Sequence, residues 1–267
     1  MKEVLIGAIA SVGAYVLLIS QVFWVALKRP PRWPLIRDQM YEMGVLSLPV
    51  IAITGLSTGM VLAAQSYFQL SDKGLASATG LMVTKAMLVE LGPVLTAFMI
   101  TGRVGAAMCA EIGTMKVTEQ IDAMRSMSVD PNGYLIAPRF ISGVIVLPLL
   151  TTFSCVMGVW GGYLVAVSYY GLPHTDFIDP LPVHITKYDL FTGMTKAILF
   201  GIIIVTISCY KGLRTRGGAA GVGRSTTNSV VICYTVILVA NFIITITLNN
   251  AHDYLVVLGQ RIEQWLI

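Results

Sequence analysis

The sequence predicts an all-α, polytopic integral membrane protein that crosses the bilayer five times. Hydrophobic residues make up 55% of the 267 positions and charged residues only 12%, whereas soluble domains carry about a quarter charged residues. Mean hydropathy is +0.76. Five apolar stretches also reach the length of about 20 residues that a membrane-spanning helix needs. They lie at about 44–70, 81–107, 140–168, 190–210 and 228–250.

The segment before the first span is also apolar. By hydropathy alone, residues 4–27 can either cross the bilayer or lie in its interface. The segment lacks the small-residue cleavage site of a secretory signal, and the basic, proline-rich boundary at 28–31 favours its retention. We therefore divide the chain into an N-terminal helix with a basic linker (1–43), a transmembrane domain (44–250) and a tail (251–267).

Loop charges predict the orientation. Segments 28–38 and 211–224 each carry four Lys or Arg residues against one acid or none, while 71–80 is balanced and 170–189 is acidic. The positive-inside rule places the first two, and the loop at 114–139, in the cytoplasm. The other two then lie outside, and the five spans alternate consistently under this assignment.

Between the second and third spans, residues 114–128 are predicted to form a short amphipathic helix on the cytoplasmic side. Apolar residues recur at helical spacing and make one narrow stripe: Val117, Ile121 and Met124. The charges form opposite-sign pairs at i, i+3, Lys116 with Glu119 and Asp122 with Arg125. A connector resting on lipid headgroups and a docking helix for a cytoplasmic partner both fit this pattern.

Four charged residues lie in or next to the second apolar stretch: Lys85, Glu90, Arg103 and Glu111. A charge in hydrocarbon costs several kcal/mol, so such residues usually face a bundle interior, a cavity or the interface. We expect Lys85 to extend outward to the interface, and Glu90 to make either a buried structural hydrogen bond or part of a transport path. Arg103 and Glu111 are about 12 Å apart along a helix and need separate partners near the cytoplasmic surface. Together these charges indicate a membrane transport component.

Small residues predict where helices pack closely. Gly55 and Gly59, continued by Ala63 and Ser66, form a small-residue face on the first span. Such faces let helix backbones approach one another, either within one subunit or across a two-fold axis. We expect the two-fold contact to use Gly55 and Gly59. Ser154, Gly158 and Gly162 repeat the pattern on the third span, where packing within the chain is favoured.

Several site types are not predicted. Cys109, Cys155, Cys209 and Cys233 fall in apolar segments without metal-binding or disulfide spacing, so they are interpreted as small buried hydrophobes. The run at 218–225 resembles a phosphate-binding loop, but it carries Arg224 where a lysine is required and follows a membrane span rather than a strand. We predict no catalytic residue, no metal site, no nucleotide site and no nucleic-acid partner.

Four runs strongly resemble the MlaE/YrbE-type ABC transporter permeases, and the resemblance covers about residues 35–250. The runs are GMVLAAQSY (59–67), ELGPVLTAFMITGRVGAAMCAEIGTMKVTEQIDAM (90–124), VDPNGYLIAPRF (129–140) and GVGRSTTNSVV (221–231). The resemblance implies a homodimeric inner-membrane permease that works with a cytoplasmic ATPase, which binds ATP and Mg, and with a periplasmic MCE-domain protein. Gram-negative members commonly add a STAS-domain protein. The implied cargo is phospholipid, moved between inner and outer membranes to maintain outer-membrane lipid asymmetry.

The resemblance also implies roles for particular residues. The coupling helix that docks on the ATPase would use Lys116, Thr118, Glu119, Gln120, Asp122 and Arg125. An outward-facing lipid pocket at the dimer interface would use Leu62, Gln65, Tyr67, Gln69 and Leu70. The stretch at 4–27 would lie as an interfacial helix. Lys85 and the tail after Asn250 have no clear counterpart in the family pattern.

Two other functions compete with this interpretation. A standalone secondary transporter or channel could use Lys85, Glu90 and Arg103 as an ion or proton relay. Such proteins often contain symmetry-related internal repeats, and we find no convincing repeat between the two halves of this sequence. A purely structural scaffold would leave the intramembrane charges unexplained.

Overall fold

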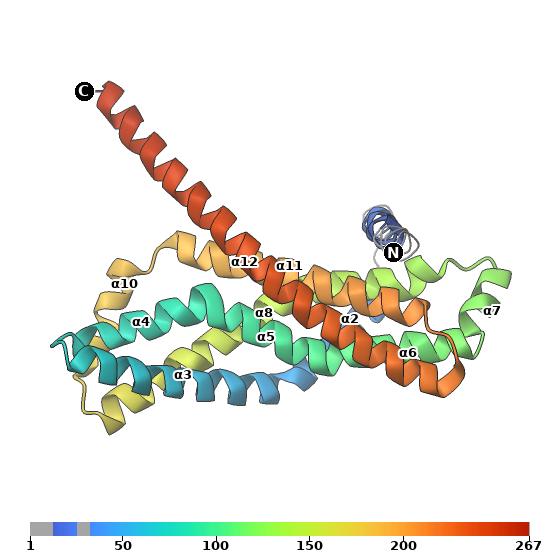
Figure 1. The fold of residues 1–267 in the computed structure, drawn as a ribbon, viewed down its shortest axis with the longest axis horizontal. Coiled ribbons are helices and arrows are strands. Elements are labelled where there is room, and N and C mark those ends of the chain that lie inside the picture. Colours follow the sequence, from blue (N-terminus) through green and yellow to red (C-terminus); the bar gives the residue numbers. More distant parts are fainter. Residues whose placement is uncertain (1–12, 26–32, 267) are drawn as a thin grey trace, which may run out of the picture.

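A computed structural model describes residues 13–25 and 33–266 (Figure 1). Most of these residues are helical, and no strand occurs among them. Five helical segments are long and apolar enough to cross a membrane, at Trp33–Ser71, Ala76–Val117, Asn132–Tyr169, Lys187–Leu213 and Gly218–Ala251. The predicted fold class and the five predicted spans are confirmed. The helical segment that contains the first predicted span begins at Trp33, because α2 (Trp33–Met43) leads directly into it.

The first three spans are built from shorter pieces. The first comprises α2, η1 (Val45–Ser47) and α3 (Leu48–Ser71). The second comprises η2 (Ala76–Ala78), α4 (Thr79–Ala86), η3 (Met87–Leu91), α5 (Gly92–Ile100), η4 (Thr101–Gly105) and α6 (Ala106–Val117). The third comprises η5 (Asn132–Ile136), α8 (Ala137–Tyr163) and η6 (Leu164–Tyr169). The short helices α9 (His174–Ile178) and α10 (Pro180–His184) then lead into α11 (Lys187–Leu213) and α12 (Gly218–Leu266).

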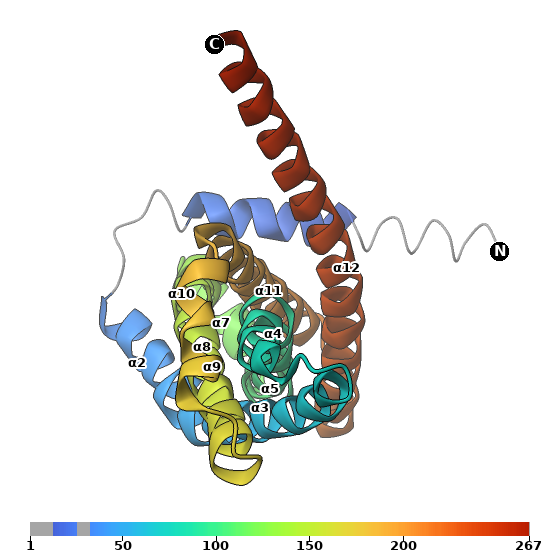
Figure 2. The same ribbon diagram turned by 90° about the vertical axis from the view of Figure 1, so that its left-hand side faces the viewer.

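The N-terminal helix, Gly13–Val25, lies across the other helices. Figure 1 shows it end-on beside the horizontal bundle, and Figure 2 shows it lengthwise. Val22 is fully buried, and the Tyr15 hydroxyl is 2.7 Å from Thr206 Oγ1 of α11. This orientation is the one expected of an interfacial helix. The rest of the predicted 4–27 stretch lies outside the described residues.

The small-residue face of α3 packs against α8 of the same chain. A Cβ added at Gly55 would lie 2.7 Å from the carbonyl oxygen of Ser154, and one added at Gly59 only 1.8 Å from that of Gly158. Ala63 and Ser66 on the same face are also buried. The expectation that this face joins two subunits is therefore wrong, because α8 already occupies it.

The second span contains two π-helical turns. One is η3, which holds Glu90 and precedes Gly92 and Pro93, and the other is η4, which holds Arg103. Proline cannot donate the hydrogen bond of a regular helix, and π-helical turns often occur at functional sites. The two turns flank α5, so two of the four charges singled out in this span, Glu90 and Arg103, lie where the helix is irregular.

The predicted cytoplasmic helix is broken in two. α6 ends at Val117, Glu119 adopts a left-handed conformation with φ of 61°, and α7 (Gln120–Ser126) begins directly after it. A left-handed residue just beyond the last helical turn is a common helix stop. The expectation of one continuous helix over 114–128 is therefore wrong, although a separate short helix does follow. It lies at one end of the bundle (Figure 1).

The last helix, α12, has 49 residues and would be about 73 Å long at 1.5 Å per residue. Figures 1 and 2 show its C-terminal part, in dark red, leaving the bundle at an angle. The tail predicted as a separate segment at 251–267 thus continues the fifth span as one helix up to Leu266.

Candidate transport groove and coupling element

A groove lies on α3, on the side turned away from α8. Its volume is about 320 Å³, and it is lined by Ser57, Thr58, Val61, Leu62, Gln65 and Leu91. Leu91 comes from η3, so the groove runs between the first and second spans. It therefore contains two of the five predicted lipid-site residues, Leu62 and Gln65.

The other three predicted residues do not line this groove. Tyr67 is five residues beyond Leu62, or about 140° further round a helix of 3.6 residues per turn. Its ring stacks instead on the ring of Tyr170, with centroids 4.4 Å apart. Gln69 is exposed and Leu70 half-buried beyond the end of the groove. The five residues therefore do not share one face of α3 in the single chain, and a pocket between two copies of this helix end stays a prediction.

A polar cluster adjoins the groove through Glu90, the neighbour of Leu91. The Lys196 ammonium of α11 lies 2.6 Å from one Glu90 carboxylate oxygen and also donates to the Val89 carbonyl at 3.0 Å. From α12, Asn241 and Thr245 donate to the same carboxylate at 3.1 and 3.0 Å. The cluster joins the second, fourth and fifth spans. Lys196 is 0% exposed, while the Glu90 side chain is 37% exposed.

Sequence analysis missed Lys196, Asn241 and Thr245. A signal for Lys196 was present, because it is a lysine within an apolar stretch of membrane length, and charges there are rare and usually paired. Asn241 and Thr245 stand at i, i+4, so they lie on one face of α12. Both hydrogen-bond donors therefore point from that face toward Glu90.

The remaining intramembrane charges have separate partners. Lys85 is exposed and forms an ion pair at 3.6 Å with Asp189 in the first turn of α11, which fits the expectation that it extends outward. Arg103 donates to the Ser47 hydroxyl at 2.5 Å and to the Glu42 carbonyl at 3.3 Å. Glu111 forms an ion pair with Arg139 at 2.8 Å. The prediction of separate partners for Arg103 and Glu111 is confirmed.

These contacts also bear on the relay hypothesis. Lys85, Glu90 and Arg103 each contact different groups. Lys85 and Arg103 are 18 residues apart, or about 27 Å along a helix. Among the described residues, the structure thus shows three local contacts and no chain of titratable groups that links the three side chains.

The coupling segment presents its charges at the end of the bundle. Asp122 lies 2.7 Å from Lys116 and 3.4 Å from Arg125. The predicted Asp122–Arg125 pair is confirmed, but Lys116 pairs with Asp122 rather than Glu119, because the left-handed turn at Glu119 removes the helical register. The hydrogen bond from Lys116 holds the pKa of Asp122 below its ordinary value. Ile121 is fully buried, whereas Thr118, Glu119, Gln120 and Arg125 are exposed.

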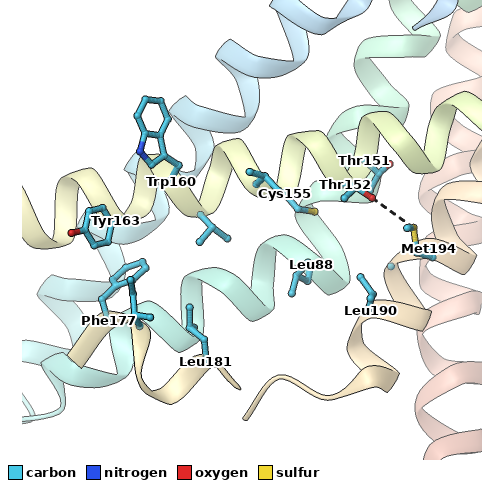
Figure 3. Close-up of a pocket in the computed structure, with 14 residues that line it drawn as sticks. Leu88, Thr151, Thr152, Cys155, Trp160, Tyr163, Phe177, Leu181, Leu190 and Met194 are labelled. Atoms are coloured by element: carbon cyan, nitrogen blue, oxygen red, sulfur yellow. Dashed lines mark hydrogen bonds between the residues drawn. The ribbon is translucent and has the colours of Figure 1, made fainter. Parts of the chain in front are cut away.

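A further cavity of about 540 Å³ lies toward α9 and α10 and contains none of the predicted site residues. Its walls are almost entirely apolar, with Leu88, Trp160, Phe177 and Leu190 around an open centre (Figure 3). The only hydrogen bond drawn there joins Thr152 to the Met194 sulfur at 3.8 Å. No charged side chain lines this cavity.

Comparison with known proteins decides the family. The profile of the family described as Permease MlaE matches residues 36–247, which is most of the chain. The chain belongs to this permease family. A probable ABC transporter permease of Rickettsia typhi is 41% identical over 235 residues, covering 88% of this chain and 91% of the relative. The resemblance inferred from the sequence is thus confirmed.

Two more relatives carry names that refer to transport or lipid. The intermembrane phospholipid transport system permease protein MlaE of Haemophilus influenzae is 38% identical over 220 residues, covering 82% of this chain and 84% of the relative. The chloroplastic protein TRIGALACTOSYLDIACYLGLYCEROL 1 of Arabidopsis thaliana is 35% identical over 229 residues, covering 86% of this chain and 65% of the relative. This MlaE-family chain is a multi-pass membrane permease of the ABC transporter class, and the relay alternative is not favoured.

Proposed function

We propose that this MlaE-family permease moves phospholipid between the inner and outer membranes, driven by ATP hydrolysis in a separate cytoplasmic ATPase. The observation that carries the proposal is the groove between α3 and η3, which has apolar walls and polar groups in one cavity. Val61, Leu62 and Leu91 suit an acyl chain. Ser57, Thr58 and Gln65 suit the ester or headgroup region of the same molecule. The name of the Haemophilus relative supports this cargo.

The groove binds mainly through apolar area. Burying such surface contributes about 25 cal/mol per Å² before the cost of ordering the lipid is subtracted. One groove of about 320 Å³ is at the small end of the range of about 300–1,000 Å³ for ligand pockets. Two copies of the groove facing each other would enclose a larger fraction of a phospholipid.

A homodimer would bring two grooves together. In the single chain, α3 and α12 are the spans with the least buried surface. Ile53 and Val61 on α3, and Phe242 on α12, are large apolar side chains left exposed. With the small-residue face of α3 already packed on α8, this opposite face of α3 becomes the proposed dimer contact.

Coupling to the ATPase would run through α7. The Lys116–Asp122 ion pair links α7 to the end of α6, and the Ile121 side chain of α7 is buried in the core. α6 continues through η4 and α5 to η3, which carries Leu91 of the groove wall. A displacement of α7 can therefore be transmitted to the groove along one continuous helical segment. The ATPase would supply the ATP and Mg sites.

The proposed assembly extends to further partners. An MCE-domain protein on the outer side would receive or deliver the lipid, and a STAS-domain protein would bind the ATPase. We place the assembly in the inner membrane, because the positive-inside rule puts the coupling segment in the cytoplasm.

Site-specific photo-crosslinking with radiolabelled phospholipid tests the groove. Crosslinkers replace Leu62, Gln65, Tyr67 and, as an exposed control on α8, Ile145. We expect strong capture at positions 62 and 65 and weak capture at 67 and 145. Equal capture at all four positions would mean contact with bulk bilayer and would remove the basis of the proposal.

A further inference from the structure

A polar pocket, here called the α2–α6 pocket, lies where α2 meets the second span. Its volume is about 250 Å³, and it shares no lining residue with the transport groove. Apolar side chains of both elements form its walls, and three charged side chains also line it: Glu42 of α2, Arg103 of η4 and Glu111 of α6. Pockets for drug-sized ligands occupy about 300–1,000 Å³, so this volume suits a lipid headgroup better than a whole lipid.

The pocket lies on the cytoplasmic side of the bundle. Glu111 belongs to α6, which ends at Val117 and is followed by α7. A Cβ added at Gly113 would lie 2.9 Å from the Thr215 hydroxyl oxygen, so this end of α6 adjoins the loop at 211–224. That loop carries four basic residues and no acid, and the positive-inside rule places it in the cytoplasm. The charges of the pocket therefore lie near the headgroups of the cytoplasmic leaflet.

The Arg103 guanidinium is held on one side and open on the other. Its Nη1 donates to the Ser47 hydroxyl at 2.5 Å and to the Glu42 carbonyl at 3.3 Å. Ser47 is buried, and its hydroxyl in turn donates to the Met43 carbonyl at 2.6 Å, so both acceptors are fixed at the junction of α2 and η1. The Nε and Nη2 atoms of Arg103 bond no described residue. This pair of donors is the fork with which arginine binds two oxygens of one phosphate.

The two carboxylates offer acceptors to the same pocket. Arg139 Nη2 lies 2.8 Å from Glu111 Oε2, and the Arg139 side chain is only 4% exposed, so this carboxylate is fixed from inside the bundle. The Glu111 side chain is 56% exposed, and its Oε1 bonds no described residue. Glu42 is exposed, and its carboxylate likewise has no bonded partner among the described residues. Within the same part of the chain, Arg103 forms no ion pair with either carboxylate.

Charges of both signs in one pocket favour a zwitterion. With Arg139 counted beside Glu111, two cations and two anions give a net charge of 2 − 2 = 0. A phosphate fits the open side of Arg103, and a primary ammonium brings three N–H donors to the two carboxylates. A quaternary ammonium has the same charge but no N–H donor. An anionic headgroup without an ammonium would place another negative charge beside both carboxylates.

We infer that the α2–α6 pocket binds the headgroup of a cytoplasmic-leaflet phospholipid that carries a primary ammonium, as in phosphatidylethanolamine. The phosphate meets Nε and Nη2 of Arg103, and the ammonium meets the Glu42 carboxylate and Oε1 of Glu111. Such a lipid joins α2 to the second span, next to the junction that Arg103 already contacts. The inference goes beyond the proposed function, because this binding requires neither an ATPase nor transport.

Site-specific photo-crosslinking in nanodiscs tests which headgroup is bound. A photo-crosslinking amino acid replaces Leu46, an exposed side chain in the pocket wall, or, in a matched protein, Ile145, an exposed side chain of α8 outside the pocket. The nanodiscs contain equal mole fractions of phosphatidylethanolamine, its N-methyl and N,N-dimethyl derivatives and phosphatidylcholine, and mass spectrometry distinguishes the captured lipids. Because each methyl group removes one N–H donor, we expect capture at position 46 to fall along this series, by about tenfold from first to last. Capture at position 145 should be equal for all four lipids.

Variants of the protein with the crosslinker at position 46 complete the test. Glu42→Gln removes a carboxylate that has no bonded partner among the described residues, so it should preserve the fold and reduce the preference by about fivefold. Asp38→Asn is an equal charge change on the same helix, outside the pocket, and should leave the preference unchanged. Phosphatidylglycerol, offered in place of phosphatidylethanolamine, should be captured less.

Four outcomes would overturn the inference. Three of them are equal capture of all four lipids at position 46, capture of phosphatidylglycerol as strong as that of phosphatidylethanolamine, and an effect of Asp38→Asn as large as that of Glu42→Gln. The fourth is an adduct between two permease chains in place of a lipid adduct, which would mean that a second copy of the chain covers the pocket.

Discussion

Removing either partner of the Glu90–Lys196 pair should cost stability, but the two costs should differ. In Glu90→Gln, the Lys196 ammonium keeps its charge at 0% exposure, with the Val89 carbonyl as its other bonded acceptor. In Lys196→Met, the Glu90 carboxylate keeps hydrogen bonds from Asn241 and Thr245 and is 37% exposed. Glu90→Gln therefore leaves the remaining charge with fewer hydrogen-bond partners than Lys196→Met does.

The magnitudes follow from that difference. Stranding one charge of a buried pair costs about 3–5 kcal/mol, and Glu90→Gln should lie in this range. Lys196→Met should cost about 1–2 kcal/mol, because Asn241 and Thr245 still donate hydrogen bonds to the carboxylate. The double variant Glu90→Gln/Lys196→Met leaves no unpaired charge, so it should be more stable than Glu90→Gln alone and give a coupling energy of about 2 kcal/mol or more.

Unfolding of the purified protein in mixed micelles with increasing SDS measures these free energies. Lys85→Met is the matched control, because it breaks the more exposed 3.6 Å pair with Asp189 and should cost no more than about 1 kcal/mol. Equal costs for the two single variants, together with an additive double variant, would refute the view that Lys196 depends on Glu90.

The remaining predictions concern packing, dimerisation and coupling. Gly59→Ala should destabilise the chain by about 3 kcal/mol or more, because its Cβ meets the α8 backbone at 1.8 Å, whereas Gly223→Ala, with nothing within 4 Å, should be neutral in the same assay. Val61→Cys should form disulfide-linked dimers on oxidation, and a purely monomeric product would remove this face of α3 from the dimer contact. Asp122→Lys should weaken co-purification of the ATPase, unlike Asp72→Lys in the opposite loop. Since the pKa of Asp122 is lowered, its ion pair is complete above the ordinary value of 3.8 and is lost only as pH falls through the lower folded value. ATPase association that declined between pH 8 and pH 5 would contradict that dependence.

The spans and their number could be predicted because each rests on a long apolar stretch, and the need for partners at Arg103 and Glu111 followed from the cost of charge in lipid. The partners themselves could not be predicted. Lys196 lies 106 residues from Glu90, and helical periodicity within one segment carries no information about which distant helix lies opposite. Gly55 and Gly59 are a second example: their spacing predicted a close helix contact but did not indicate that the partner helix is α8.

Local backbone conformation was the other source of error. The i, i+3 pairing of Lys116 with Glu119 assumed an unbroken helix, and Glu119 is neither glycine nor asparagine, the residues that usually mark a left-handed stop. Helical spacing also separates Leu62 from Tyr67, although both occur in a run that resembles the family pocket.

Transport by the purified permease tests the central claim most directly. The permease, isolated with whatever ATPase accompanies it, is reconstituted in vesicles that contain a labelled phospholipid, and transfer of the label to an acceptor is followed with ATP, without ATP, and with an imposed proton gradient. The proposed function predicts a stoichiometric ATPase and transfer that requires ATP hydrolysis and is strongly reduced by Leu62→Gln. Transfer driven by the proton gradient in the absence of an ATPase would contradict it.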